Sequence, residues 1–137
     1  MTSDAPCIFC AIVAGDAPAH LVLEDEHAVA FLDIAPANDG HTLVIPRRHV
    51  TGLHDADPED LARVAALAAR VDARLRDVLA PDGTNLFLAS GVAAWQTVFH
   101  LHLHVVPRWD ADALRQPWTP APGDPQRLRE IGARLRA

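Results

Sequence analysis

The sequence contains no lysine and no tyrosine, and all twelve of its basic residues are arginines. These absences exclude a Schiff-base lysine, a lysine general base, a tyrosine nucleophile and the phosphate-binding lysine of a Walker motif. The formal net charge is −6 at pH 7, and no basic stretch stands out. Because nucleic-acid-binding proteins present a basic face, we expect no nucleic-acid partner.

Long apolar segments are also absent, since no run approaches the ~20 residues that a membrane span needs. The start of the chain, MTSDAPCIFC, has no basic region and carries Asp4, which does not fit a signal peptide. Only two cysteines occur, Cys7 and Cys10. We therefore expect no membrane partner, a cytoplasmic location and reduced thiols.

Hydrophobic spacing and turn residues predict an α+β fold with a largely antiparallel five-stranded sheet and one long helix. The long helix is expected to begin at Asp57-Pro58, a typical N-cap and first-turn pair. Its helical spacing of apolar residues ends before Pro81. Short helices are expected over 7–14 and 125–137, and strands within 20–33, 41–46, 84–90 and 98–107. We expect one domain over 1–110 and a tail over 111–137 whose short helix packs on that domain.

The stretch FHLHLHVVPRW, residues 99–109, places His100, His102 and His104 at two-residue spacing. In a strand these side chains share one face, about 6.5–7 Å apart, while Leu101 and Leu103 point the other way. We expect the leucines to face the long helix, which leaves the histidine face open.

Three interpretations of this row are possible from the residues alone. The histidines can be polar residues on the wet side of a strand, or two of them can share a zinc ion. All three cannot bind one ion, because they span about 13–14 Å. Imidazole is also nucleophilic and partly deprotonated near neutral pH, which favours a catalytic task for at least one.

HLHLHVV resembles the signature of the histidine triad (HIT) family, in which three histidines alternate with apolar residues. The segments over 8–50 and 91–108 resemble the family's N-terminal half and its catalytic segment. The resemblance implies a HIT-like fold and a homodimer that binds a purine nucleotide such as AMP. It also implies nucleotidyl hydrolysis or transfer, acting on adenosine phosphoramidates or dinucleoside polyphosphates through a covalent nucleotidyl-histidine.

The same resemblance assigns catalytic roles by position. His102 corresponds to the nucleophile, and a backbone carbonyl near His100 is expected to hold its second ring nitrogen. His104 and Gln96 correspond to residues that contact the phosphate oxygens or the leaving group. The hydroxyl of Thr97 is expected to add a further donor.

Nucleotide-binding positions carry over as well. Asp33 corresponds to the residue that binds the ribose hydroxyls, although it also fits a turn after a strand. Phe31 and Ile34 correspond to residues that line the base pocket, although both also fit a plain core. His41 corresponds to a histidine that supports the triad.

Cys7 and Cys10 have the CxxC spacing of zinc ligands, which is a weak signal alone. The resemblance completes the set with His49 and His100, and implies a structural Zn²⁺ with four protein ligands and no open position. Two buried free thiols or a redox pair are the alternatives, although no strand precedes the motif as in thioredoxin-like proteins.

Two positions depart from the family pattern. Ala89 replaces an amide that commonly contacts the nucleotide, and Trp95 replaces the glycine before Gln96. Trp95 is expected to fill a gap, stack on a base or leaving group, or close the pocket. These departures motivate an alternative function, a nucleotide-binding regulatory module with little turnover; a zinc-dependent hydrolase is a third possibility. We assign no function to His20, His27 and His54.

Overall fold

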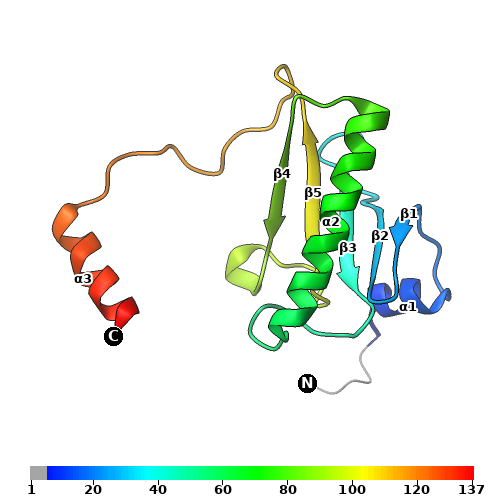
Figure 1. Cartoon of the computed structure of the whole chain (residues 1–137), viewed down its shortest axis with the longest axis horizontal. Helices are drawn as coiled ribbons and strands as arrows, with labels where there is room; N and C mark the ends of the chain where they lie inside the picture. The colour runs from blue at the N-terminus through cyan, green and yellow to red at the C-terminus, as the bar shows by residue number, and fades with distance from the viewer. Residues whose placement is uncertain (1–5) are drawn as a thin grey trace.

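The structure is a computed structural model that describes residues 6–137, so the first five residues of the expected domain lie outside the described range. Within this range, three helices and five strands confirm the predicted α+β fold (Figure 1). In chain order they are α1 (Ile8–Ala14), β1 (Leu21–Glu24), β2 (Ala28–Leu32), β3 (Thr42–Pro46), α2 (Pro58–Leu79), β4 (Gly83–Leu88), a 3₁₀ turn η1 (Val92–Ala94), β5 (Leu103–Arg108) and α3 (Pro125–Arg136).

The five strands form one sheet in the order β1-β2-β3-β5-β4, and every neighbouring pair is antiparallel. After α2 crosses the sheet, β4 forms an edge, and β5 returns between β4 and β3 (Figure 1). This return places β5, the strand that carries His104, between two neighbouring strands of the sheet.

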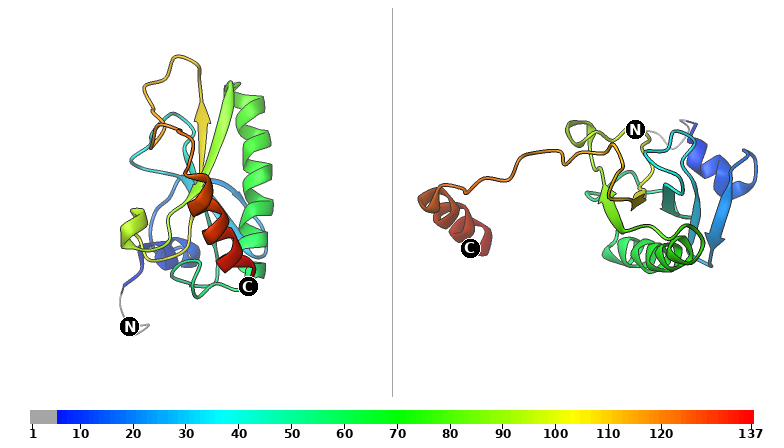
Figure 2. Two further views of the ribbon diagram at one scale, coloured as in Figure 1. Left: turned by 90° about the vertical axis from the view of Figure 1, so that its left-hand side faces the viewer. Right: turned by 90° about the horizontal axis from the view of Figure 1, so that it is seen from above.

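Helix α2 covers one face of the sheet, as its sequence predicts (Figure 2). Asp57 caps its first turn by accepting from the Glu59 N–H, and the Asp60 carboxylate accepts from the Asp57 N–H in a capping box. Val64, Leu67 and other buried residues of α2 pack on β2, β3 and β5. Each such side chain contributes about 1.5–3 kcal/mol when fully buried.

A second apolar cluster lies outside the α2 core and joins α1 to the sheet. Phe9 of α1 is 6% exposed and packs with Phe31, Leu43 and Ile45 of β2 and β3. Helix α1 ends at Gly15, whose φ of 81° is in the left-handed region that glycine adopts readily.

The C-terminal segment differs from the expectation that it packs on the same domain. Residues after Asp112 run away from the sheet, and α3 stands apart from the other elements (Figures 1 and 2). No residue of α3 is buried. The physical reason lies in the connecting segment, where Pro117, Pro120 and Pro122 favour an extended, stiff chain that cannot fold back easily.

Within residues 6–137, none of the helices combines the length and the apolar character that crossing a bilayer requires.

Candidate active site

The histidine segment is only partly a strand, which corrects the sequence-based prediction. β5 begins at Leu103, so His100 and His102 lie in an irregular segment before it. The Leu101 N–H donates to the Val50 carbonyl at 2.8 Å and ties this segment to the chain after β3.

The histidine face is also less open than predicted. His100 is 0% and His102 is 5% exposed, and only His104 is half-buried. Leu103 packs in the α2 core as expected, so the histidines do take the opposite face. That face is covered at this point by Phe9 of α1, whose ring meets His102 edge-on with centroids 5.2 Å apart.

A backbone carbonyl fixes the tautomer of His102. Its Nδ1 lies 2.8 Å from the carbonyl oxygen of His100, which can only accept, so Nδ1 carries the proton. In the neutral ring the lone pair then sits on Nε2. Within residues 6–137 no hydrogen bond is made by that Nε2, which leaves His102 with an unpartnered nucleophilic nitrogen.

A second backbone group fixes the tautomer of His104 through His41. The Ala37 N–H donates to Nδ1 of His41 at 2.9 Å, so the proton of neutral His41 is on Nε2. That nitrogen lies 2.8 Å from Nδ1 of His104 and donates to it. His104 therefore carries its proton on Nε2, where no described protein group accepts it.

Burial keeps both of these histidines neutral. Loss of hydration on burial, together with the smaller effect of the nearby His102 and His41 rings, lowers the pKa of His104 to about 4, against the opposing effect of Asp33. Burial also lowers the pKa of His41, against the opposing effect of Asp33. The face thus combines a free lone pair on His102 with a free N–H on His104, on rings 5.0 Å apart.

Asp33 lies beside this pair, at the end of β2. One carboxylate oxygen accepts the Ala35 N–H at 2.8 Å, which is a turn contact, and the other lies 3.6 Å from Nε2 of His41. Asp33, His41 and His104 are close enough to hold a metal. However, His41 accepts at Nδ1, so ligation through Nε2 would require an imidazolate, and this trio fits a hydrogen-bonded relay better.

Sequence reasoning missed the aromatic residue that covers His104. Phe87 of β4 stacks on the His104 ring with centroids 3.9 Å apart and planes 7° from parallel. The two residues are cross-strand partners in the β4–β5 ladder. Once that register is known, an aromatic residue opposite a histidine is a signal, but the register depends on a pairing between distant strands.

The two predicted base-pocket residues are not brought together. Phe31 is 3% exposed and packs against Phe9 in the core, with ring centroids 5.3 Å apart. Ile34 is 89% exposed and lies in the loop after β2. Ile34 is thus available to a ligand, whereas Phe31 is part of the apolar core.

Gln96 is buried and bonded entirely to its own chain. Its Nε2 donates to the carbonyls of Thr51 and Val98, at 2.6 and 3.0 Å, and its Oε1 accepts from the Gly91 N–H at 2.8 Å. In this conformation the amide holds the loop that contains η1 and does not face a ligand. Thr97 is exposed beside it.

Trp95 occupies a backbone conformation that favours glycine. Its φ is 75°, in the left-handed region, and its side chain is 75% exposed. An L-residue with a large side chain is strained there by about 1–2 kcal/mol. The glycine that the family pattern has at this position is therefore explained by the backbone.

The four predicted zinc ligands do come together. Nδ1 of His100 lies 3.5 Å from the sulfur atoms of both Cys7 and Cys10 and 3.2 Å from Nδ1 of His49. The Cys10 sulfur lies 3.3 Å from Nδ1 of His49. Tetrahedral Zn²⁺ with bonds of 2.0–2.3 Å separates its ligand atoms by about 3.3–3.8 Å, so these residues fit the ion.

The surroundings of this cluster also suit a cation. Nε2 of His100 donates to the Pro46 carbonyl at 2.8 Å, which aims the lone pair of Nδ1 at the cysteines. Burial, together with the neighbouring Cys7, raises the pKa of the Cys10 thiol to about 11. A metal ion offsets this cost because it stabilises thiolates directly.

The chain is similar to several known proteins over most of its length. Residues 14–111 match the model of the HIT domain family. A solved protein of Streptococcus mutans is 37% identical and superposes with a TM-score of 0.91, over 99% of this chain and 85% of that one. A zinc-bound histidine triad protein of Mycobacterium smegmatis is 47% identical, with a TM-score of 0.77 over 95% of each chain. An adenosine 5'-monophosphoramidase of Schizosaccharomyces pombe is 34% identical over 94% of this chain and 95% of its own.

Proposed function

The chain belongs to the HIT family, and on that premise we propose that it is a nucleotidyl hydrolase or transferase with His102 as its nucleophile. The substrates are adenosine phosphoramidates or dinucleoside polyphosphates. The observation that carries the proposal is the pairing of two free nitrogens, a lone pair on His102 and an N–H on His104, each set by a backbone hydrogen bond. The phosphoramidase activity of the yeast relative supports the same class of substrate.

In the first step, Nε2 of His102 attacks the α-phosphorus in line with the leaving group. A nitrogen–phosphorus bond forms, and the leaving group departs with the electron pair of its bond and takes a proton from solvent. The adduct is an N-phosphoryl imidazolium, whose Nδ1–H the His100 carbonyl stabilises. The Nε2–H of His104 donates to a phosphate oxygen or to the leaving atom.

In the second step, water attacks the same phosphorus and the bond to His102 breaks. AMP is released, the proton of the water passes to solvent, and the lone pair returns to Nε2. A transferase reaction differs only in the acceptor that replaces water. Asp33 has one oxygen that is free of short hydrogen bonds, which suits a ribose hydroxyl, and the exposed Ile34 suits one side of the base.

The proposal includes a structural zinc held by Cys7, Cys10, His49 and His100. Bound there, the ion would fix His100, whose carbonyl orients the nucleophile, and would supply no open position for substrate. The zinc-bound relative from Mycobacterium smegmatis supports this assignment. Because thiolate ligands must stay reduced, a cytoplasmic location belongs to the same proposal.

A homodimer is also part of the proposal. β4 is an edge strand, and its Leu86 and Phe87 side chains are 54% and 45% exposed. An exposed edge strand with apolar residues is a ready template for pairing with another chain.

A regulatory nucleotide-binding module is the second candidate. It is favoured by the burial of His102 and by the engagement of Gln96 with its own chain, since both limit access to the phosphate. Such a module would bind AMP tightly and release almost none from any substrate.

Assays with adenosine phosphoramidate and diadenosine polyphosphates as substrates distinguish the enzyme from the regulatory module. AMP release is followed by chromatography for the native protein, His102→Ala and the control His54→Ala. We expect turnover by the native protein and the control, loss of at least 10³-fold in His102→Ala, and a nucleotidyl adduct on His102 by mass spectrometry. Equal turnover by native protein and His102→Ala would overturn the mechanism. AMP binding without turnover would favour the regulatory module.

A further inference from the structure

Cys7 and Cys10 lie together at the start of α1. Cys7 is the N-cap residue, and its sulfur accepts a hydrogen bond from the Cys10 N–H at 3.4 Å. The two sulfur atoms lie within 4.8 Å of each other. A disulfide needs sulfur atoms about 2.05 Å apart and Cα atoms about 4.4–6.8 Å apart, and CxxC pairs in disulfide oxidoreductases meet both conditions. Rotation of the two side chains can therefore close a disulfide within one chain.

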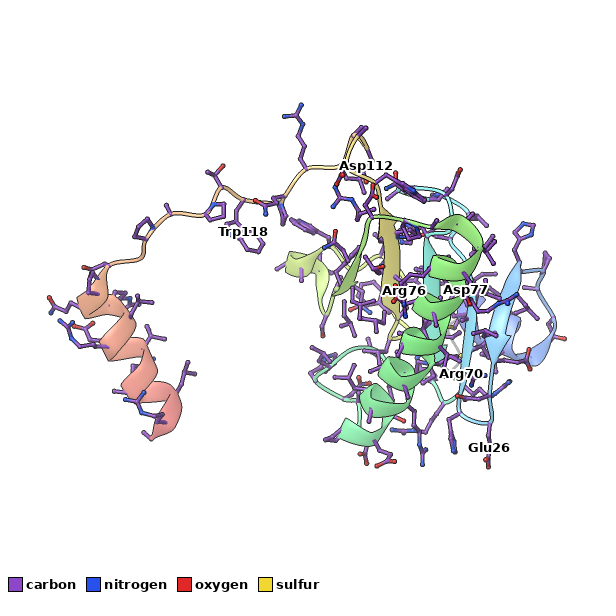
Figure 3. The ribbon with its side chains drawn as sticks, turned by 45° about the horizontal axis from the view of Figure 1, so that its top comes forward. Glu26, Arg70, Arg76, Asp77, Asp112 and Trp118 are labelled. Atoms are coloured by element: carbon purple, nitrogen blue, oxygen red, sulfur yellow. The ribbon has the colours of Figure 1, made fainter. Side chains whose placement is uncertain are left out.

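The pair also lies where solvent reaches it. Both cysteines are half-buried, and His49 beside Cys10 is exposed. The contact between the Cys10 sulfur and Nδ1 of His49, at 3.3 Å, lies on the surface of the molecule. Helix α1 lies beside β1 and β2, whereas the C-terminal segment leaves on the other side of the molecule, past β4 (Figure 1). Trp118 of that segment is correspondingly far from α1 (Figure 3). Within residues 6–137, the C-terminal segment thus leaves the cysteine pair open to a small oxidant.

The role of zinc ligand and the role of redox pair use the same form of the two cysteines. A cysteine binds Zn²⁺ as the thiolate, which is also the form that attacks an oxidant. The cluster has four ligands, so oxidation of both cysteines leaves only His49 and His100. Two imidazoles do not make up the four-ligand set of a structural zinc site. Closure of the disulfide and release of the ion are therefore expected to occur together.

Phe9, which lies between the two cysteines in the sequence, connects them to the nucleophile. Its ring lies against His102 and His100, with centroids 5.2 and 6.0 Å apart. The same ring packs on Phe31 in the second apolar cluster, with centroids 5.3 Å apart. Phe9 and Cys10 share the first turn of α1. Because close-packed side chains transmit small movements, closing a disulfide in this turn shifts the ring that covers His102.

His100 provides a second connection. Its Nδ1 lies 3.5 Å from both sulfur atoms, and its carbonyl oxygen accepts from Nδ1 of His102 at 2.8 Å. One residue thus contacts the metal ligands with its side chain and the nucleophile with its backbone. Once the cysteines are oxidised, the hydrogen bond from Nε2 to the Pro46 carbonyl is what still holds the His100 ring. The orientation of His102 therefore depends on the state of the two sulfur atoms.

We propose that Cys7 and Cys10 form a redox-sensitive modification site, at which a peroxide closes a disulfide, releases the zinc and lowers the activity of His102. The site rests on the proposed zinc, and its effect on turnover rests on the proposed function. A dithiol reverses the modification by thiol–disulfide exchange, and zinc then binds again.

The oxidation proceeds in two steps. The Cys10 thiolate attacks one oxygen of hydrogen peroxide, because its contact with His49 is the exposed one. A sulfur–oxygen bond forms and the oxygen–oxygen bond breaks, which gives a sulfenic acid and hydroxide. The Cys7 thiolate then attacks the sulfenic sulfur, so that the disulfide forms and a second hydroxide leaves. Each hydroxide takes a proton from solvent. In sum, the two thiolates lose two electrons, and the peroxide gains them and becomes two molecules of water.

Oxidation of the reduced, zinc-loaded, full-length protein by hydrogen peroxide tests the site. A chromophoric chelator measures zinc release, mass spectrometry examines the peptide that contains both cysteines, and AMP release from adenosine phosphoramidate gives kcat in the same samples. We expect one zinc released for each disulfide, a peptide lighter by two hydrogen atoms, and a fall in kcat of about 10–10²-fold. A dithiol with added Zn²⁺ should restore the native kcat.

Cys10→His is the matched control. Histidine is also a zinc ligand, whereas the single remaining cysteine cannot close a disulfide within the chain. The zinc content of the reduced variant is measured first. At the same peroxide dose, it should release zinc about tenfold more slowly than the native protein, because the exposed thiolate is gone. Release as fast as from the native protein would contradict the role of the pair.

Diamide provides a second measurement that needs no variant, and so stays decisive even if Cys10→His folds without zinc. This azo compound takes two electrons and two protons from a pair of thiols and leaves a disulfide. It should release zinc from the native protein as peroxide does. Disulfides formed only between chains, sulfinic acids in place of a disulfide, or zinc retained after both cysteines are oxidised would each overturn the site.

The three readouts separate this inference from the proposed function. Zinc release with an unchanged kcat would overturn the connection to His102. A reduced protein without zinc would overturn the zinc assignment and the modification site together. A zinc-loaded protein that releases no AMP from any substrate would overturn the proposed function, while zinc release and the mass of the peptide would still decide the modification site.

Discussion

Nε2 of His41 lies 2.8 Å from Nδ1 of His104, and this contact determines which nitrogen of His104 carries a proton. The tautomer of His41 is fixed by a backbone group, because the Ala37 N–H donates to Nδ1 of His41. The His100 carbonyl fixes the tautomer of His102 in the same way, by accepting from its Nδ1. Two backbone groups therefore make one imidazole a nucleophile and the other a donor, although both are histidines two residues apart.

Substitutions at His41 test this dependence. His41→Gln keeps an N–H near the position of Nε2, so His104 keeps its tautomer and kcat should fall less than about tenfold. His41→Glu places an acceptor there, which moves the His104 proton to Nδ1. Without a donor on the phosphate side, kcat should fall about 10²–10³-fold.

The tautomer itself is measured by ¹⁵N shifts of the His104 ring. We expect the Nε2–H form in the native protein and in His41→Gln, and the Nδ1–H form in His41→Glu. A merely structural role for His41 would lower kcat in both variants in proportion to their loss of thermal stability. Unchanged His104 shifts in His41→Glu would contradict the relay.

The regular elements were predictable because they depend on local signals. A few adjacent residues determine each of three features: the N-cap of α2 at Asp57, the end of α1 at Gly15 and the hairpin through Asp25. The zinc ligands were predictable by resemblance and come together in the structure. Because His49 and His100 are far from the two cysteines in the sequence, the prediction came from the family resemblance and could not come from residue spacing.

The features that sequence reasoning missed depend on distant contacts. Phe87 covers His104 only because β4 pairs with β5 in one register. His100 and His102 are buried because α1, more than 80 residues earlier, brings Phe9 over them. The resemblance predicts that Gln96 contacts the phosphate oxygens or the leaving group, and its partners Thr51 and Val98 appear only when the loop is folded.

Zinc binding should be visible without any assay of activity. Elemental analysis should give about one zinc per chain, and Co²⁺ in its place should show the visible bands and thiolate charge transfer of a tetrahedral S₂N₂ site. Cys10→Ser should lower the metal affinity and the melting temperature, because metal binding is coupled to folding.

The control for the metal site is His20→Ala, which removes an exposed histidine that is not a member of the cluster. It should retain full zinc content and the native melting temperature. A Cys10→Ser protein with native zinc content would show that the ion is bound elsewhere.

Acid should destabilise the protein through His104. Its pKa is lowered from 6.5 to about 4, first by burial. Between these values the unfolded chain binds more protons than the folded one, so the free energy of unfolding falls as the pH is lowered from 6.5 toward 4. Discounted for partial exposure, the loss should be about 1–2 kcal/mol. Urea unfolding at pH 7.5, 6 and 5 measures it.

His104→Gln serves as the comparison for the pH series, because glutamine does not titrate. Its free energy of unfolding should depend less on pH in this window, while any acid loss due to the zinc ligands stays common to both proteins. Parallel pH profiles would show that His104 does not contribute to the acid sensitivity.

Trp95 and Ala80 give a matched pair for the last prediction, because both have left-handed φ values, 75° and 48°. Replacing either by glycine removes backbone strain, which is partly offset by the greater freedom of glycine in the unfolded chain. Trp95→Gly and Ala80→Gly should therefore each raise the free energy of unfolding by about 0.5–1 kcal/mol. Only Trp95→Gly should also change catalysis, because Trp95 directly precedes Gln96 in the chain and glycine lets the backbone N–H groups approach a phosphate. We expect KM for adenosine phosphoramidate to fall about threefold to tenfold in Trp95→Gly and to stay native in Ala80→Gly. Identical kinetics in both variants would mean that Trp95 has no part in choosing the substrate.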